Sequence, residues 1–125
     1  MASISQLLGR LTRTPEELRA ETCREWASSV PGTTRIGDIE TRRHQKAAGV
    51  VQNIRIDPRE GSGSIEVTIS DGTGYLVAKW LGRQSLSGIG LGTGLVVNGI
   101  AGRSSDGELV ILNPEYELVP HPEQG

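Results

Sequence analysis

The periodicity of apolar residues changes near residue 33, and this change constrains the fold more than any other feature of the sequence. Before it, apolar residues recur at helical spacing; after it, they alternate or form short β-branched runs between glycine-rich turns. The 17 glycines among 125 residues supply those turns. We therefore expect a helical arm over residues 1–32, a β domain over residues 33–119 and a flexible tail over residues 120–125.

Two short helices are expected in the arm. Residues 3–12 place three leucines on one side of a helix, and Thr14-Pro15-Glu16-Glu17 is typical of the start of a second helix. Its threonine can cap the helix, its proline suits the first turn, and its second glutamate completes a capping box. This helix should extend to about Ser28, with a narrow apolar stripe that includes Trp26. Cys23 on that stripe is expected to be a small buried hydrophobic residue, with a reactive thiol as the alternative.

Five strands are expected in the β domain, and alternation defines the central pair best. Apolar residues occupy every second position of residues 64–70, and Asp71-Gly72-Thr73-Gly74 provides a tight turn into residues 75–81. The remaining expected strands are residues 45–57, 95–102 and 108–112.

A long first strand and a connector between the third and fourth strands fit a five-stranded Greek-key barrel of the OB-fold type. Gly49 lies within the first strand, where it lowers the steric cost of the bend that a strand shared by both halves of a small barrel must make. The expected fold is therefore mainly β, and α+β overall once the helical arm is included.

Composition argues against several classes of protein. Lys and Arg number 13 and Asp and Glu 15, a formal net charge of −2, which argues against a strongly cationic duplex coat. The single cysteine excludes an intrachain disulfide and a multi-cysteine zinc site. No apolar run is long enough to span a membrane, and the first residues do not have the pattern of a secretory signal, which favours the cytoplasm.

No catalytic constellation is present in the sequence. Residues 88–94 are rich in glycine, but they do not fit a G-x-G-x-x-G register and no Gly-Lys-Ser/Thr follows, so they predict a connector. His44 and His121 have no sequence-local carboxylate or serine partner, and Asp71 is a single carboxylate without spaced partners for a metal. We therefore expect a non-enzymatic protein with no cofactor and no metal site.

Several stretches resemble the nucleic-acid-binding OB domains. They are Gly49-Val50-Val51, residues 65–74 and Leu76-Val77-Ala78-Lys79-Trp80. Domains of this kind include the anticodon-binding domain of class II aminoacyl-tRNA synthetases and the OB module of bacterial replicative polymerases. Residues 92–99 and the exit at Pro114-Glu115-Tyr116 are most similar to the wedge domain of RecG-type helicases.

The resemblance covers about residues 36–118 and implies a nucleic-acid-contacting OB module in a small stand-alone bacterial protein. The sequence has no helicase motor and no Walker A motif, so the resemblance does not imply helicase activity.

Charge is distributed unevenly along the chain. Residues 31–59 carry six basic and three acidic side chains, a net charge of +3, whereas residues 60–125 carry three basic and eight acidic ones. The basic segment is either part of a binding groove or a solvated strand face.

The nucleic-acid face of an OB barrel comprises strands 2 and 3 and the loops between strands 1–2 and 4–5. Phosphates are bound by cations along a groove, and bases stack on flat side chains. The candidate contacts on this face and its approach are Arg42, Arg43, Lys46, Arg55, Arg59, Tyr75, Lys79, Trp80, Arg83 and Arg103.

Alternation in the third strand places Tyr75 and Lys79 outward and Trp80 on the core side. A core position is therefore favoured for Trp80, with base stacking as the alternative. Glu66 should share the outer face of the neighbouring strand, where it can pair with Lys79.

The sequence predicts sequence-tolerant binding of single-stranded or branched nucleic acid through a local basic groove, with DNA favoured over RNA. A protein–protein adaptor that uses the barrel and the apolar arm is the alternative, and no membrane partner is expected. The arm packs either on its own barrel or on a protein partner. Convergence of the basic side chains on one surface would favour nucleic acid.

Overall fold

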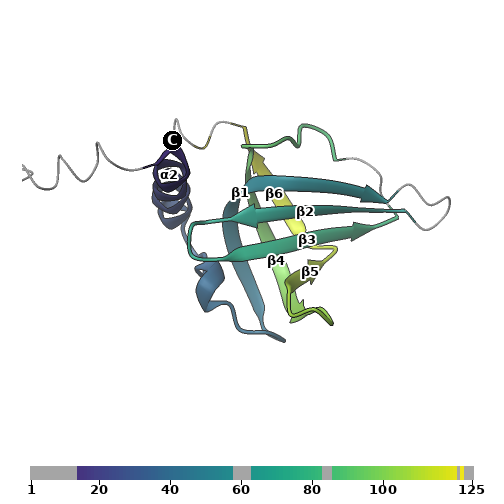
Figure 1. The fold of residues 1–125 in the computed structure, drawn as a ribbon. Coiled ribbons are helices and arrows are strands. Elements are labelled where there is room, and N and C mark those ends of the chain that lie inside the picture. The colour runs from purple at the N-terminus through teal and green to yellow at the C-terminus, as the bar shows by residue number, and fades with distance from the viewer. Residues whose placement is uncertain (1–13, 58–62, 83–85, 121, 123–125) are drawn as a thin grey trace, which may run out of the picture.

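The computed structural model describes residues 14–57, 63–82, 86–120 and 122, and over these ranges the protein is mainly β with one α-helix (Figure 1). The expected first helix at residues 3–12 lies outside the described residues, as does most of the expected tail. No helix among the described residues is both long and apolar enough to cross a membrane.

Helix α2 spans Pro15–Ser29 and begins where the sequence predicts. The Thr14 side chain accepts a hydrogen bond from the backbone N–H of Glu17 at 3.2 Å, and Pro15 occupies the first turn, where its missing N–H costs nothing. After Val30 the chain turns through Gly32, whose φ of 77° suits glycine. The 3-10 turn η1, Ile36–Asp38, then leads into the sheet.

The rest of the described chain is built around a single six-stranded sheet. Its strands are β1 His44–Asp57, β2 Ser64–Ser70, β3 Tyr75–Leu81, β4 Gly94–Arg103, β5 Leu109–Leu112 and β6 Glu115–Val119. The order is β1-β2-β3-β5-β4-β6, and β4 also pairs with β1, so the sheet curls into a partly closed ring. The bounds of the five predicted strands agree with the structure to within one residue at each end.

Strand β1 closes this ring by changing its partner halfway along its length. Residues 44–50 pair with β4, residues 50–57 pair with β2, and the register shifts between Val51 and Asn53. At the crossover, a Cβ on Gly49 would lie 3.1 Å from Ile69 Cβ and from the backbone of Ser70. Glycine therefore permits the close approach of β1 and β2 that the bend requires.

The sixth strand was not predicted. Strands β5 and β6 both pair antiparallel with β4, and β5 also pairs parallel with β3. Between them lie Asn113, with a φ of 47°, and Pro114. Strand β5 ends before this pair, but the chain then continues along β4 as β6, so the expected count of five strands is one too low.

Trp80 holds the bend between β5 and β6 in place. Its indole N–H donates to the Pro114 carbonyl at 3.1 Å, and its ring meets that of Tyr116 edge-on with centroids 5.2 Å apart. Asn113 adds two bonds: its N–H donates to the Lys79 carbonyl at 2.7 Å and its Oδ1 accepts from the Leu81 N–H at 3.0 Å.

The base-stacking alternative for Trp80 is wrong. Its side chain lies in the core with 3% of its surface exposed, so its ring has no open face for a base. The core position that alternation favours is the observed one, and Trp80 leaves the set of candidate nucleic-acid contacts.

The main core fills the inside of the ring. Its largest fully buried side chains are Ile65, Ile69, Leu76, Leu95, Val51, Val67 and Val97. A second cluster joins Trp26 and Ala27 of α2 to Ala48 of β1 and Val96 of β4. Helix α2, the described part of the arm, therefore packs on the outside of its own sheet.

Replacing Gly94 by alanine should loosen the contact between α2 and the sheet. The added Cβ would lie 2.9 Å from two ring atoms of Trp26 and 3.1 Å from the Val119 carbonyl oxygen. We expect Gly94→Ala to lower the free energy of unfolding by about 1–3 kcal/mol, measured by urea denaturation followed by tryptophan fluorescence.

Gly102→Ala is the matched control on the same strand, because an added Cβ there meets no atom within 4 Å. Its unfolding free energy should stay within about 0.5 kcal/mol of the parent protein. Equal losses in the two variants would contradict the proposed role of the Gly94–Trp26 contact.

Candidate nucleic-acid interface

A groove of about 530 Å³ crosses the outer face of β3, β5 and β4. We call it the outer-face groove, and its lining residues are Arg42, Glu66, Lys79, Ile100, Ala101, Gly102, Arg103, Ser104, Val110 and Leu112. Three of the predicted cations, Arg42, Lys79 and Arg103, therefore converge on one surface although they lie far apart in the sequence.

The register of the sheet places Lys79 in a row of side chains. Lys79 is opposite Glu66 on β2 and Leu112 on β5, and Glu66 is opposite Arg55 on β1. Because paired residues on neighbouring strands share a face, these four side chains cross the outer surface of four strands in sequence.

Glu66 forms ion pairs with the cations on both sides of it. Its Oε2 lies 3.7 Å from Arg55 Nη1, and its Oε1 lies 3.8 Å from Lys79 Nζ. The predicted pairing of Glu66 with Lys79 is confirmed. Both contacts are long and Arg55 is 78% exposed, so they contribute little to stability. Their main effect is to reduce the positive charge at this end of the groove.

Arg42 and Arg103 both reach the groove near the C-terminal end of β4. The Arg42 N–H donates to the Ala101 carbonyl at 2.9 Å, and the residue has a φ of 66°, which is uncommon outside glycine and asparagine. Arg103 Nη1 donates to the Gly107 carbonyl at 2.9 Å, across the hairpin that joins β4 to β5.

That hairpin carries two acidic side chains that interact with each other. The pKa of Glu108 is raised, first by its hydrogen bond with Asp106 and then by the charge of Asp106. The pKa of Asp106 is lowered, first by its hydrogen bond with Ser104 and then by that with Glu108. Because Arg103 donates to the Gly107 carbonyl, its positive charge lies beside these two acidic side chains.

Tyr75 lies in a hollow that adjoins the groove. This hollow has a volume of about 480 Å³ and is lined by Tyr75, Val77, Arg103 and Glu108 among others, so Arg103 belongs to both depressions. Tyr75 is 68% exposed. With Trp80 buried, Tyr75 is the remaining predicted residue on this surface whose ring is open for stacking.

Arg43 and Lys46 do not line the groove. Arg43 pairs with Glu40 at 2.8 Å. Lys46 donates to the Pro31 carbonyl at 3.4 Å and lines a different hollow, beside Glu115 and Glu117. Arg59 and Arg83 lie outside the described residues.

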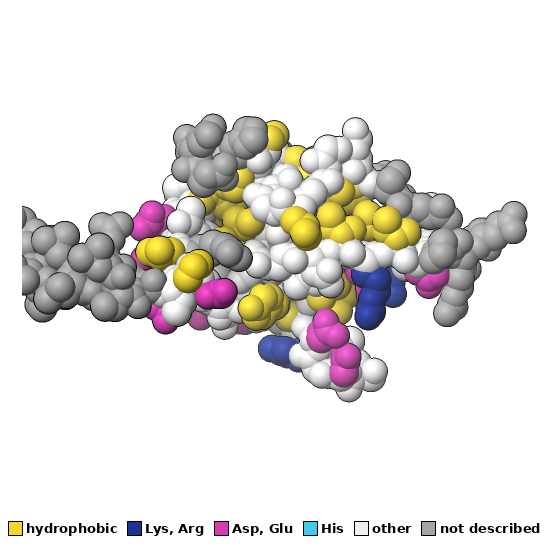
Figure 2. All heavy atoms as spheres, turned by 45° about the horizontal axis from the view of Figure 1, so that its top comes forward, with side chains coloured by type: hydrophobic (Ala, Val, Ile, Leu, Met, Phe, Trp, Pro, Cys, Tyr) yellow, Lys and Arg dark blue, Asp and Glu magenta, His cyan; other side chains and the backbone are white. Residues whose placement is uncertain are grey.

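Two groove residues were missed by the sequence reasoning. Ile100 and Leu112 are 58% and 57% exposed, although apolar residues in strands are normally assigned to the core. Figure 2 shows hydrophobic side chains gathered in an interrupted band on one face of the protein, with lysine and arginine side chains beside one end of the band. The signal available in the sequence was that residues 109–112 are apolar at every position, so one face of β5 had to be exposed or covered by something else.

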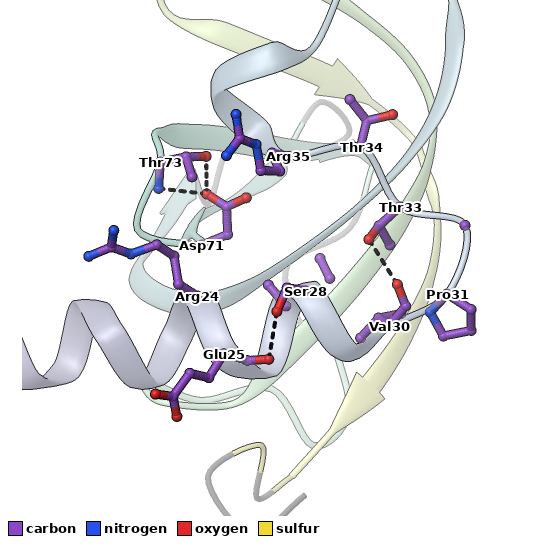
Figure 3. A pocket seen from close by; sticks show the side chains of 13 residues that line it. Arg24, Glu25, Ser28, Val30, Pro31, Thr33, Thr34, Arg35, Asp71 and Thr73 are labelled. Carbon is purple, nitrogen blue, oxygen red and sulfur yellow. Dashed lines mark hydrogen bonds between the residues drawn. The ribbon is translucent and has the colours of Figure 1, made fainter. Parts of the chain in front are cut away.

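A further hollow of about 530 Å³ lies between α2, residues 31–35 and the turn that joins β2 to β3 (Figure 3). Arg24 and Arg35 line it together with Asp71, which is 3% exposed. The Asp71 carboxylate accepts hydrogen bonds from the Ile36 N–H at 2.9 Å and from the N–H and hydroxyl of Thr73 at 2.9 and 2.6 Å. Asp71 therefore anchors η1 to the turn.

The described part of the chain contains no group of three or more His, Cys, Asp or Glu side chains that could hold a metal ion.

Comparison with known proteins gives a likeness in structure alone. No protein-family profile matches the chain, and no curated protein matches it in sequence. Among solved structures, it is similar to RecG bound to a three-way DNA junction, with a TM-score of 0.58 and 17% sequence identity. The likeness covers 68% of this chain and 12% of RecG, so the chain corresponds to a small part of that protein and shares its fold there.

Cys23 lies on the inner side of α2 and is 8% exposed, as expected for a small buried residue. Burial raises the pKa of its thiol, and the charge of Asp71 raises it further. A raised pKa means a smaller thiolate fraction at any given pH, and the thiolate is the reactive form.

We therefore expect Cys23 to react with a disulfide reagent at least about tenfold more slowly in the native protein than in urea. The labelling rate of the native protein should also rise at a pH above the ordinary thiol range. A variant that combines Cys23→Ser with Ser28→Cys provides the control, because Ser28 is exposed on the same helix. Fast labelling of the parent protein, equal to that of the control, would show that Cys23 is accessible and reactive.

Proposed function

We propose that this chain is a non-catalytic nucleic-acid-binding module with an OB-like fold, which binds single-stranded or branched DNA through the outer-face groove. The observation that carries the proposal is the convergence of Arg42, Lys79 and Arg103 on that groove. Cations from separate segments that meet along one depression suit a phosphate backbone better than a compact ligand.

The strand pairing supports the finer description of the fold. In the OB barrel the first strand is shared by two parts of the sheet, as β1 is here, and the barrel has five strands. If β5 and β6 are counted as one strand bent at Asn113-Pro114, the ring has five strands. The likeness to RecG, which was solved with a three-way DNA junction, supports the same ligand class.

The charges of the groove favour sequence-tolerant binding of modest affinity. Contacts to phosphates position a nucleic acid but carry no sequence information. Glu66 offsets part of the charge of Arg55 and Lys79, and Tyr75 is the one predicted stacking residue left on this surface. The net charge of −2 does not oppose this proposal, because the cations are concentrated locally.

A second candidate function, a protein–protein adaptor, is favoured by a separate apolar hollow of about 560 Å³ between α2 and β1. Leu18, Trp26 and Leu91 line it, and Leu91 is 71% exposed. This hollow is distinct from the outer-face groove, so variants can test the two functions separately. The proposal also includes a bacterial, cytoplasmic setting, which rests on the sequence resemblance.

Binding to DNA should weaken steeply as salt is added. With about three phosphates neutralised, the log–log slope for a single strand should be roughly −2, at about −0.7 per phosphate. Fluorescence anisotropy with single-stranded, duplex and forked DNA, and with single-stranded RNA, measures the slope and the preferred ligand together. Absence of binding to all four at low salt would contradict the proposed function.

Removing one groove cation should lower the affinity and make the salt slope shallower by roughly 0.7. Lys79→Gln and Arg42→Asn are suitable variants, because asparagine tolerates the positive φ of position 42. Arg43→Gln is the matched control, since Arg43 is adjacent in sequence but pairs with Glu40 and does not line the groove. An unchanged slope in Lys79→Gln and Arg42→Asn would exclude the groove even if the protein binds DNA elsewhere.

A further inference from the structure

Ile100 and Leu112 form an exposed apolar surface among the cations of the outer-face groove. Both line the groove with Arg42, Lys79 and Arg103, and more than half of each side chain is exposed. Phosphate contacts make no use of such side chains. They therefore call for an explanation beyond charge.

An exposed aliphatic side chain gains free energy when a ligand removes its surface from water. The ligand must then carry an apolar face as well as negative charge to fit this groove. Leu112 pairs in register with Lys79, on strands that lie about 4.8 Å apart. One nucleotide can therefore reach the ammonium group with its phosphate while its base or sugar covers Leu112.

Whether a nucleic acid can contact both Lys79 and Leu112 in this way depends on whether it is single-stranded or duplex. A duplex presents phosphates outward and keeps the faces of its bases stacked inside, so it can satisfy the cations but leaves the aliphatic surface largely uncovered. A single strand can turn its unstacked bases toward the protein. The charge of the groove and its apolar floor together fit an unpaired strand.

We propose that Ile100 and Leu112 form a platform for the bases of a single strand, so that the groove selects single-stranded over duplex nucleic acid. This inference rests on the proposed function and adds to it the strand state and the side chains that determine it. Aliphatic side chains take the role that aromatic rings often have in such sites, because Trp80 is buried and Tyr75 lies in the adjoining hollow.

The test compares Ile100→Ser, Leu112→Ser and the double variant with the parent protein. Both side chains are exposed, so the urea unfolding midpoint should stay unchanged. By fluorescence anisotropy with an oligothymidine and a duplex of the same length, single-strand affinity should fall roughly threefold per substitution and about tenfold in the double variant. Duplex affinity and the salt slope should not change, since no charge is altered.

Leu91→Ser is the matched control, because Leu91 is more exposed than either platform residue and lines the hollow beside α2. Equal losses for single strand and duplex, or no loss for either, would overturn the platform and leave the proposed function standing. Failure of the parent protein to bind any nucleic acid would overturn both. Binding of an acidic leucine-containing peptide that the double variant abolishes, with single-strand binding unchanged, would assign the surface to a protein partner.

Discussion

The pairing of β1 with two different strands is the constraint on which the rest of the structure depends. Its first half pairs with β4 and its second half with β2, so a single strand bridges β2 and β4 and curls the sheet into a partly closed ring. The bend requires β1 to approach β2 closely at Gly49, where any side chain would meet Ile69 and Ser70. The buried core inside the ring and the face against which α2 packs both follow from this geometry.

The position of the candidate site depends on a second constraint, the contacts around Trp80. Hydrogen bonds from Trp80 to Pro114 and from Asn113 to Lys79 hold the end of β5 against β3 and then turn the chain away. Lys79 and Leu112 are neighbours because of this parallel pairing. Trp80, a candidate for stacking on a base, thus supports the groove from inside the protein.

Much of the fold could be predicted from local patterns, and less of the site. Alternation and turn residues define β2 and β3 fully, and Thr14-Pro15 gives the start of α2, because these signals act within a few residues. Strand β6 was missed because its pairing with β4 is long-range and a proline precedes it. The sequence also could not show that Arg42 lines the groove whereas Arg43 and Lys46 do not. This distinction depends on the long-range strand register and on the bends of the chain. The exposure of Leu112 is likewise set by its neighbour across the sheet.

Glu66 does more on the outer face than lower its net positive charge, because it occupies two cations at once. This carboxylate lies between Arg55 and Lys79, within 3.8 Å of each, and so competes with any incoming anion for both. A monovalent anion would gain little by displacing it, whereas a chain of phosphates could also engage Arg42 and Arg103 at the same time. On the proposed function, such a shared carboxylate makes the surface favour a ligand with many linked negative charges over a small anion.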